Sequence, residues 1–508
     1  MSKVSMRLAT AAILVLVLTP TVSAQNLAEF EKKITVETLD NGLTLIVMER
    51  PVAPVFSFFT HVNAGGAQEV PGITGLAHMF EHMAFKGTDK IGTSDFEAEK
   101  RALARVEETY QAYDRARRSP TGVDEAEVAR LEKEWRDSMA EADKYVVSNQ
   151  FGEIVDRVGG VGLNAFTSSD ETGYFYSFPS NRLELWAYLE SERFLNPVMR
   201  EFYKERDVVT EERRMRTESQ PIGRLVEQFL TTAFMAHPYG QPVVGWPSDL
   251  RTFSATDAQR FYDTYYVPAN MVVVVVGDVK ASDVVSLVKR YFGRIPAGAK
   301  PEPLRTEEPP QRAERIVRLT EASQPIYIEG YHKPATIHPD NAAYSAIADL
   351  MSSGRTSRLY RRLVRDDQIA AFAAGFNDFP GSKYPNMFAF FGVPTPGHTP
   401  EEIRDAIREE IERIKTEPVS AEDLKMVKTR AKANLLRQLR NNQGLALQLG
   451  TYQALFGDWR ELFREVDRIE KVTAEDITRV ANETFVESNR TVGMIQSTQM
   501  AGAKGGAE

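Results

Sequence analysis

One apolar stretch of this chain, residues 73–85, contains two histidines and a glutamate among side chains typical of a protein core. Pro71 and the Lys-Gly pair that follows Phe85 mark the expected start and end of a helix. In a helix, His78 and His82 lie one turn apart on one face, with Glu81 beside them. We expect this helix to be buried, so the three polar side chains must find partners inside the fold.

The spacing H-x-x-E-H predicts a metal site. Two imidazoles at positions i and i+4 can bind one zinc ion through neutral nitrogens at about 2.0–2.1 Å. Glu81 is too crowded to serve as a third ligand, but it is placed to take a proton from water. The pattern is the inverted form of the H-E-x-x-H zinc-protease helix. With seven histidines in 508 residues, chance predicts about 0.01 matches, so the motif is specific.

Composition excludes other kinds of site. The chain has no cysteine, which excludes disulfides, thiolate metal sites, iron–sulfur clusters and a cysteine nucleophile. A net charge of −9 and a pI near 5.6 argue against nucleic acid as the partner. The length of 508 residues is enough for two to four domains.

The first 24 residues predict a secretory signal peptide. Lys3 and Arg7 precede the apolar run 8–18, and a small-x-small site predicts cleavage between Ala24 and Gln25. The apolar run is too short to span a bilayer comfortably. We therefore expect an exported protein, periplasmic or secreted, without stable membrane insertion; the alternative is an uncleaved N-terminal anchor.

The remaining chain predicts an α+β protein in two unequal halves. Asn41-Gly42 between two alternating apolar segments predicts a β-hairpin, and the valine run 271–277 predicts a buried strand. Helices in the second half are expected at about 341–352, 400–416, 420–440 and 474–486. The predicted boundaries are 25–297 for the first domain, 298–312 for a proline-rich exposed linker, 313–498 for the second domain and 499–508 for a disordered tail.

Residues 94–147 predict a charged helical hairpin inserted in the first domain. A capping box from Ser94 to Glu97 opens its first helix, and Asp124 caps the second. Apolar side chains repeat at spacings of three and four in both helices, so the two should pack as an antiparallel pair. These side chains are Phe96, Leu103, Val106, Tyr110 and Tyr113, then Val128, Leu131, Trp135, Met139, Ala142 and Val146. We interpret the segment as a self-packed structural insertion; a lid or docking arm is the alternative.

A catalytic zinc needs a third protein ligand. Candidates lie on the predicted helix 201–214, where Glu205 and Glu212 are two turns apart on one face. Glu211 is rotated by about 100° and is interpreted as part of a solvated acidic face.

The H-x-x-E-H segment followed by E-x6-E resembles the M16 zinc peptidases, the family of insulinase, pitrilysin and mitochondrial processing peptidase. The resemblance implies that Glu212 is the third zinc ligand beside His78 and His82. It also implies that Glu81 and Glu205 are the catalytic carboxylates, with Glu205 supporting the site. It also implies two homologous LuxS/metallohydrolase-like α+β domains that form half of a clamshell. The expected activity is that of a zinc endopeptidase, with one Zn2+ per chain, acting on peptides or unfolded polypeptides in an enclosed chamber.

The spacing of the motifs agrees with the inserted hairpin. The family usually has about 75 residues between the second histidine and the ligand glutamate, whereas 129 residues separate His82 from Glu212. The excess is nearly the length of the hairpin 94–147.

Further segments extend the resemblance over most of the chain. One such segment consists of Asn164, Ala165, Phe166 and Thr167 and resembles the family's N-A-x-T-S segment. In relatives this segment leads to an edge strand that pairs with substrate backbone. The stretch from Ser352 to Tyr360 resembles a segment of the second domain, which carries no H-x-x-E-H. Relatives often have an arginine and a tyrosine that contact substrate; the matching region, 382–397, has Tyr384 but no arginine.

Two other functions remain open: a catalytically silent scaffold or binding subunit in a heteromeric complex, and a hairpin-based binding or chaperone module with a structural zinc. The resemblance implies a homodimer or a heterodimer with a second M16-like subunit, because four such domains enclose the chamber. The other five histidines, His61, His237, His332, His338 and His398, are interpreted as structural or surface residues.

Overall fold

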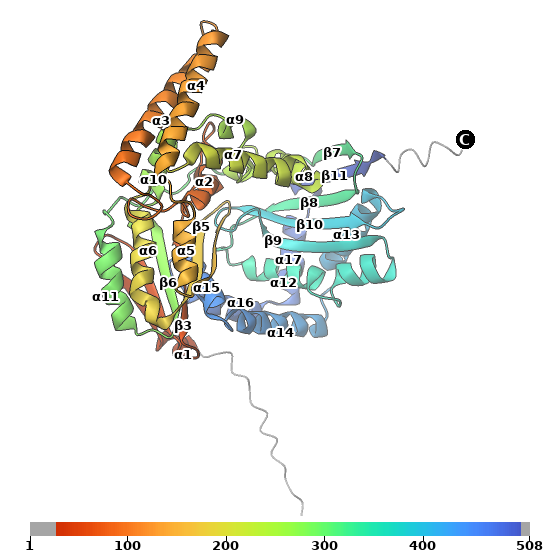
Figure 1. Cartoon of the computed structure of the whole chain (residues 1–508). Coiled ribbons are helices and arrows are strands. Elements are labelled where there is room, and N and C mark those ends of the chain that lie inside the picture. The colour runs from red at the N-terminus through yellow and green to blue at the C-terminus, as the bar shows by residue number, and fades with distance from the viewer. Residues whose placement is uncertain (1–26, 499–508) are drawn as a thin grey trace, which may run out of the picture.

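The computed structural model describes residues 27–498, which form two β-sheets with helices packed around them (Figure 1). The predicted signal peptide and the predicted tail lie outside the described residues. The six-stranded sheet has the order β1-β2-β6-β3-β5-β4 and the five-stranded sheet the order β7-β11-β8-β10-β9. The strands are β1 Ile34–Thr38, β2 Thr44–Glu49, β3 Val55–Val62, β4 Val161–Thr167, β5 Thr172–Pro179, β6 Met271–Gly277, β7 Arg315–Glu321, β8 Ile326–Lys333, β9 Ala370–Phe379, β10 Asn386–Pro394 and β11 Arg490–Ser497.

Five strands of the first sheet are repeated in the second. The order β2-β6-β3-β5-β4 matches β7-β11-β8-β10-β9 position by position. In both sheets the first pair is parallel and the other pairs are antiparallel. The valine strand β6 is buried throughout because it is central and covered on both faces. The prediction of two α+β domains of one fold is therefore confirmed.

Helices cover both sheets. Those of the first half are α1 Leu27–Glu31, α2 Leu76–Met83, α3 Phe96–Arg117, α4 Glu125–Ala142, α5 Gln150–Arg157, α6 Leu183–Leu195, α7 Phe202–Arg213, α8 Pro221–Ala233, α9 Pro247–Leu250, α10 Ala255–Tyr265 and α11 Ala281–Tyr291. Those of the second half are α12 Asn341–Ser352, α13 Pro400–Thr416, α14 Ala421–Gln438, α15 Asn442–Phe456, α16 Glu461–Lys471 and α17 Ala474–Thr484. The four helices predicted in the second half are confirmed as α12, α13, α14 and α17.

The two halves exchange one helix each. Helix α8 from the first half packs its Leu225 and Phe229 on strands β8, β10 and β11 of the second sheet. Helix α15 from the second half packs against β3 and β6 of the first sheet, with Leu445 and Leu449 in the same apolar cluster. Gly450 allows this close approach, since a Cβ there would lie 2.6 Å from the Phe59 ring. Each half therefore completes the core of the other.

Helices α3 and α4 form the predicted antiparallel hairpin, which projects away from the two sheets (Figure 1). The predicted cap of its first helix was wrong by one residue. Asp95 is the N-cap and accepts a hydrogen bond from the Ala98 amide, while the Ser94 hydroxyl donates to the Tyr145 carbonyl. Asp124 caps the second helix as predicted, accepting from the amides of Ala126 and Glu127.

The proline-rich segment 298–312 contains no helix or strand, but it contacts the first half. The Glu308 carboxylate accepts hydrogen bonds from the amides of Met235, Ala236 and His237, just beyond the end of α8. The segment is thereby attached to the first half.

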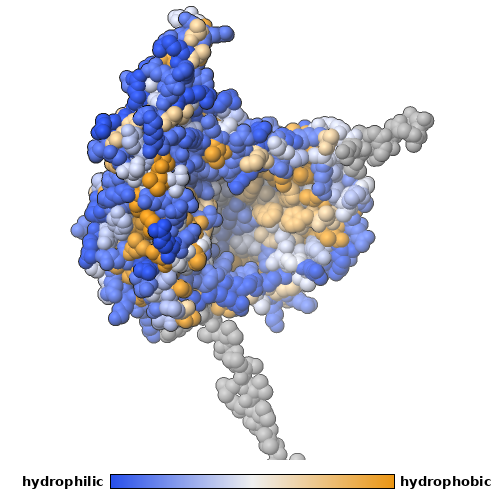
Figure 2. Space-filling view, in the orientation of Figure 1, coloured by the Kyte–Doolittle hydropathy of each residue, from blue (hydrophilic) through white to orange (hydrophobic). Residues whose placement is uncertain are grey.

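The surface has two contrasting regions. Figure 2 shows a hydrophilic hairpin and, in the hollow between the two halves, hydrophobic side chains on the wall formed by the second sheet. Strand β9 exposes Phe372 and Phe376 at its edge position. None of the helices within residues 27–498 combines the length and apolar character needed to cross a membrane.

Candidate metal centre

Helix α2 is fixed by a buried carboxylate at its N-terminus. The helix begins at Leu76, later than the predicted start at Pro71, because Gly72 and Gly75 take positive φ values of 101° and 97° and form a turn. Glu69 accepts hydrogen bonds from the amides of Gly75 at 2.7 Å and Ala77 at 2.6 Å. Burial raises the pKa of Glu69 to about 8. The sequence analysis missed this residue, although an acidic side chain before a Pro-Gly turn and a helix is a usable signal.

The ring nitrogens of His78 and His82 converge on Glu212. Oε2 of Glu212 lies 3.7 Å from Nε2 of His78 and 3.3 Å from Nε2 of His82. Helix α2 carries the two histidines and α7 carries the glutamate, and the two helices pack together. The apolar side chains of α2 are buried as expected, which leaves the polar face directed at α7. The structure thus brings Glu212 to two histidines that lie more than a hundred positions earlier in the sequence.

This donor set fits a zinc ion. Ligand atoms at about 2.0–2.1 Å from one tetrahedral ion lie roughly 3.3–3.4 Å apart, close to the two distances above. One potential ligand atom from each residue lies within 4.8 Å of the others, and no second such group occurs among the described residues. Burial lowers the pKa of His78 to about 4, so its imidazole is neutral and able to coordinate a metal. Nδ1 of His78 is buried without a hydrogen-bond partner.

Glu205 lies in the first turn of α7, on the same helix face as Glu212, and contacts His82. Its Oε2 lies 3.3 Å from Nδ1 of His82, and its other oxygen pairs with Lys86. Burial opposes ionisation of Glu205, but the hydrogen bonds from His82 and Lys86 outweigh it and lower its pKa. Burial lowers the pKa of His82, but the carboxylates of Glu205 and Glu212 outweigh burial and raise it. Glu211 points to solvent and pairs with Arg214, as expected for a residue outside the site.

Glu81, the residue before His82, lies beside the edge strand β4. The Thr167 hydroxyl donates a 2.8 Å hydrogen bond to Oε2 of Glu81. Burial raises the pKa of Glu81, and the hydrogen bond from Thr167 opposes that rise. Thr167 therefore contacts the carboxylate predicted to be catalytic, a role that sequence reasoning did not assign to it.

The rest of the predicted substrate-binding segment forms strand β4. Within residues 27–498 this strand pairs only with β5, and its other edge has no partner strand there. Asn164 is exposed, Ala165 is buried, and the Phe166 ring stacks on Phe59 with centroids 6.1 Å apart. A cavity of about 580 Å³ opens beside the histidines, lined by Glu81, His82, Phe85, Lys86, Glu201, Glu205, Arg200 and residues 146–149.

The remaining histidines lie elsewhere. Nδ1 of His61 is buried 2.5 Å from the Glu171 carboxylate, and Nδ1 of His237 accepts from the Tyr239 amide. His332 contacts the Ala233 carbonyl, and His338 and His398 lie near the ends of helices. Tyr384 packs against the rings of His237 and Tyr239.

Comparisons with known proteins agree with this geometry. Residues 46–113 match the family described as insulinase (peptidase family M16), and residues 252–431 match the peptidase M16 inactive domain. The chain is 28% identical over 464 residues to the zinc protease PqqE of Helicobacter pylori, covering 89% of this chain and 90% of the relative. It is 21% identical to the uncharacterized zinc protease YmxG of Bacillus subtilis, over 89% of this chain and 95% of that one.

Solved structures extend the match to the fold. The crystal structure of a protease from Helicobacter pylori superposes with a TM-score of 0.77 and 26% identity, covering 91% of this chain and 99% of that chain. A peptidase M16 inactive domain from Pseudomonas fluorescens has a TM-score of 0.71 at 14% identity, covering 92% and 98%. The matches reach both halves and nearly the whole described chain, and so the protein belongs to peptidase family M16.

Proposed function

We propose that this protein is a zinc-dependent endopeptidase that hydrolyses peptides or unfolded polypeptide segments. The observation that carries the proposal is the convergence of His78, His82 and Glu212. Glu81 lies beside them and accepts a hydrogen bond from Thr167 of the edge strand β4. The relatives named zinc proteases support it.

His78, His82 and Glu212 would hold the ion, and Glu205 would orient the imidazole of His82 through its Nδ1. A bound zinc ion supplies a Lewis acid that acidifies water and polarises the scissile carbonyl. Glu81 accepts the proton of the attacking water and delivers it to the leaving amine. Thr167 keeps the Glu81 carboxylate in position.

Substrate would add to the free edge of β4 through backbone hydrogen bonds, along Asn164, Ala165, Phe166 and Thr167. Such pairing depends little on side-chain identity, which suits a peptidase for unfolded segments. The adjoining cavity beside Glu81 and His82 gives room for a substrate side chain.

The expected cellular setting follows from the chain's organisation. We infer an exported, periplasmic or secreted protein with a signal peptide at 1–24, a metal-binding domain at 25–297 and a second domain at 313–498. A homodimer, or a heterodimer with another M16-like subunit, would close the hollow between the halves seen in Figure 2.

Replacing the proposed base tests the function. Glu81→Gln keeps the size of the side chain and its contact with Thr167 but cannot accept a proton. We expect it to retain one zinc per chain by elemental analysis and to cleave a fluorogenic peptide about 10²–10⁴-fold more slowly. Asp349→Asn, on helix α12 of the other half, is the matched control and should cleave like the wild type. Wild-type turnover by Glu81→Gln in pure protein would contradict the proposal, and loss of cleavage by both variants would indicate a general effect on folding.

A further inference from the structure

One of the residues through which helix α7 contacts the helical hairpin is a buried arginine, Arg206. Arg206 follows Glu205 in the sequence and lies about 110° around the helix from the stripe that carries Glu205 and Glu212. Its side chain points to the hairpin and is 5% exposed. The hairpin therefore contacts a face of α7 that is about 110° from the face of the candidate metal ligands.

Three aromatic rings surround this guanidinium. The centre of the Arg206 guanidinium lies 5.0 Å from the Tyr110 ring of α3, 5.9 Å from the Trp135 ring of α4 and 4.9 Å from the Tyr203 ring of α7. The rings also contact one another, with centroids 4.3 Å apart for Tyr110 and Tyr203. A cation enclosed by aromatic faces is held strongly when it is desolvated.

Hydrogen bonds fix the same arginine. Nη1 of Arg206 donates to the Tyr110 hydroxyl at 2.7 Å and to the Phe253 carbonyl at 3.0 Å. The Tyr110 hydroxyl in turn donates to the Thr252 carbonyl at 3.0 Å. A buried charge with good partners is costly to disturb, so this contact defines the position of α7 relative to the hairpin.

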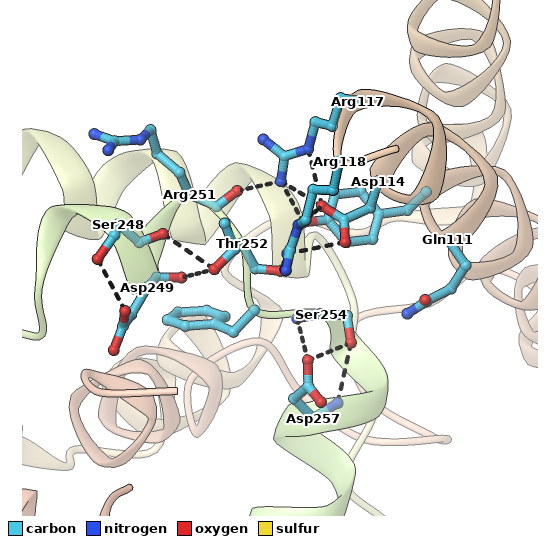
Figure 3. Close-up of polar contacts among 12 residues, drawn as sticks. Gln111, Asp114, Arg117, Arg118, Ser248, Asp249, Arg251, Thr252, Ser254 and Asp257 are labelled. Atoms are coloured by element: carbon cyan, nitrogen blue, oxygen red, sulfur yellow. Dashed lines mark hydrogen bonds and ion pairs between the residues drawn. The ribbon is translucent and has the colours of Figure 1, made fainter. Parts of the chain in front are cut away.

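The hairpin also contacts the loop between helices α9 and α10. Figure 3 shows Asp114, Arg117 and Arg118 of α3 facing the segment that contains Arg251 and Thr252. Arg117 donates to the Arg251 carbonyl at 2.9 Å, and Arg118 donates to the Thr252 carbonyl at 3.3 Å.

Helix α9, which ends where this loop begins, contacts the start of the helix that carries the two histidines. Oδ2 of Asp249 accepts from the Thr74 hydroxyl at 2.7 Å, from the Thr74 amide at 3.2 Å and from the Gly72 amide at 3.0 Å. These residues form the turn just before α2. The hairpin therefore contacts α7 directly and contacts the turn before α2 indirectly, through helix α9 and the loop after it.

We propose that the inserted hairpin positions the metal ligands, and that Arg206 and Tyr110 are the positioning residues through which it does so. The hairpin holds α7 so that Glu212 meets the two histidines and Glu205 meets His82. This inference rests on the proposed zinc site. It assigns a role to the buried face of the hairpin, which packs on the first half, and leaves its exposed face outside the site.

Zinc affinity tests the proposal independently of catalysis. The variants are Arg206→Gln, the conservative Arg206→Lys and Tyr110→Phe, which loses only a hydroxyl. Lys133→Ala, on the 76% exposed face of the same hairpin, is the control. The dissociation constant for zinc is measured by competition with a chromogenic chelator, and kcat and KM are measured at saturating zinc.

We expect zinc binding about tenfold weaker for Arg206→Gln, with partial rescue by Arg206→Lys and a smaller loss for Tyr110→Phe. At saturating zinc, kcat should fall while KM stays near the wild-type value. Lys133→Ala should match the wild type in both assays. If Arg206→Gln does not fold, Arg206→Lys and Tyr110→Phe decide the question.

Wild-type zinc affinity and kcat in all folded Arg206 and Tyr110 variants would overturn the proposal, even if their unfolding midpoints fall. A purely structural role lowers the unfolding midpoint without changing the zinc affinity of the folded protein. Failure of the wild-type protein to bind zinc would instead contradict the proposed function, so the two failures are distinguishable.

Discussion

The two halves of this protein share the order of five strands but carry different side chains on one equivalent pair of helices. Helix α12 follows β8 as α2 follows β3, and α14 is the second helix after β10 as α7 is after β5. In the first half this pair brings together His78, His82 and Glu212. In the second half the corresponding pair is joined by an ion pair between Asp349 and Arg430 at 2.6 Å. The same scaffold therefore accepts either a set of candidate metal ligands or a salt bridge between these helices.

The link from the edge strand to the first helix is present in both halves. Thr167 of β4 donates to Glu81, and the Asn377 amide of β9 donates to Asn341 and Ser345 on α12. Only the first link reaches a carboxylate beside two imidazoles. The comparison indicates that the fold supplies the position of the edge strand and that a few side chains supply the chemistry.

Removal of one candidate metal ligand should show the largest difference between substitutions in the two halves. His82→Ala leaves only two ligands, so we expect loss of the bound zinc and of peptide cleavage. Asp349→Ala in the second half should retain one zinc per chain and its cleavage activity. Elemental analysis after dialysis measures the first quantity and a fluorogenic peptide the second. Zinc retained by His82→Ala would mean that the ion binds elsewhere.

The exchanged helices should contribute comparably to stability. Phe229→Ala in α8 and Leu449→Ala in α15 each remove a fully buried side chain from the opposite half's core. We expect a loss of about 3–5 kcal/mol for the phenylalanine and about 2–5 kcal/mol for the leucine. Urea unfolding followed by circular dichroism measures both. A single transition in each variant is expected because the cores are shared, whereas two separate transitions would show that the halves unfold independently.

The edge-strand links should differ in function. Thr167→Val removes the hydroxyl that donates a hydrogen bond to Glu81. We expect kcat to fall about 10- to 150-fold with zinc retained, since one hydrogen bond to a charged group contributes about 1.5–3 kcal/mol. Asn377→Ala removes the equivalent link in the second half and should leave kcat unchanged. Thr167→Ser, which keeps the hydroxyl, should restore most of the rate. Equal kcat in Thr167→Val and the wild type would remove Thr167 from the mechanism.

Much of the metal centre could be predicted because helix geometry is local. The i and i+4 spacing places His78 and His82 on one face, and the seven-residue spacing places Glu205 and Glu212 on another. The choice of Glu212 over Glu205 as ligand came from the resemblance, and it agrees with the observed distances. The start of α2 was misplaced because Pro71 opens a glycine turn rather than the helix itself.

Helices α15 and α16 were not predicted, and α15 shows why. Its apolar side chains are spread around the helix, because it packs on a sheet from the other half and on its own half at once. A helix buried in this way lacks the one-sided stripe on which sequence reasoning depends.

By itself, the sequence determined which residues share a helix face, where the buried valine strand lies and that the inserted segment folds back on itself. Periodicity and turn chemistry act over a few residues, so they can be read along the chain. Only the tertiary structure decided that α2 meets α7, that Glu69 holds the N-terminus of α2 and that Arg206 joins α7 to the hairpin. These contacts join residues far apart in the chain, and the packing of complete helices selects them rather than any local pattern.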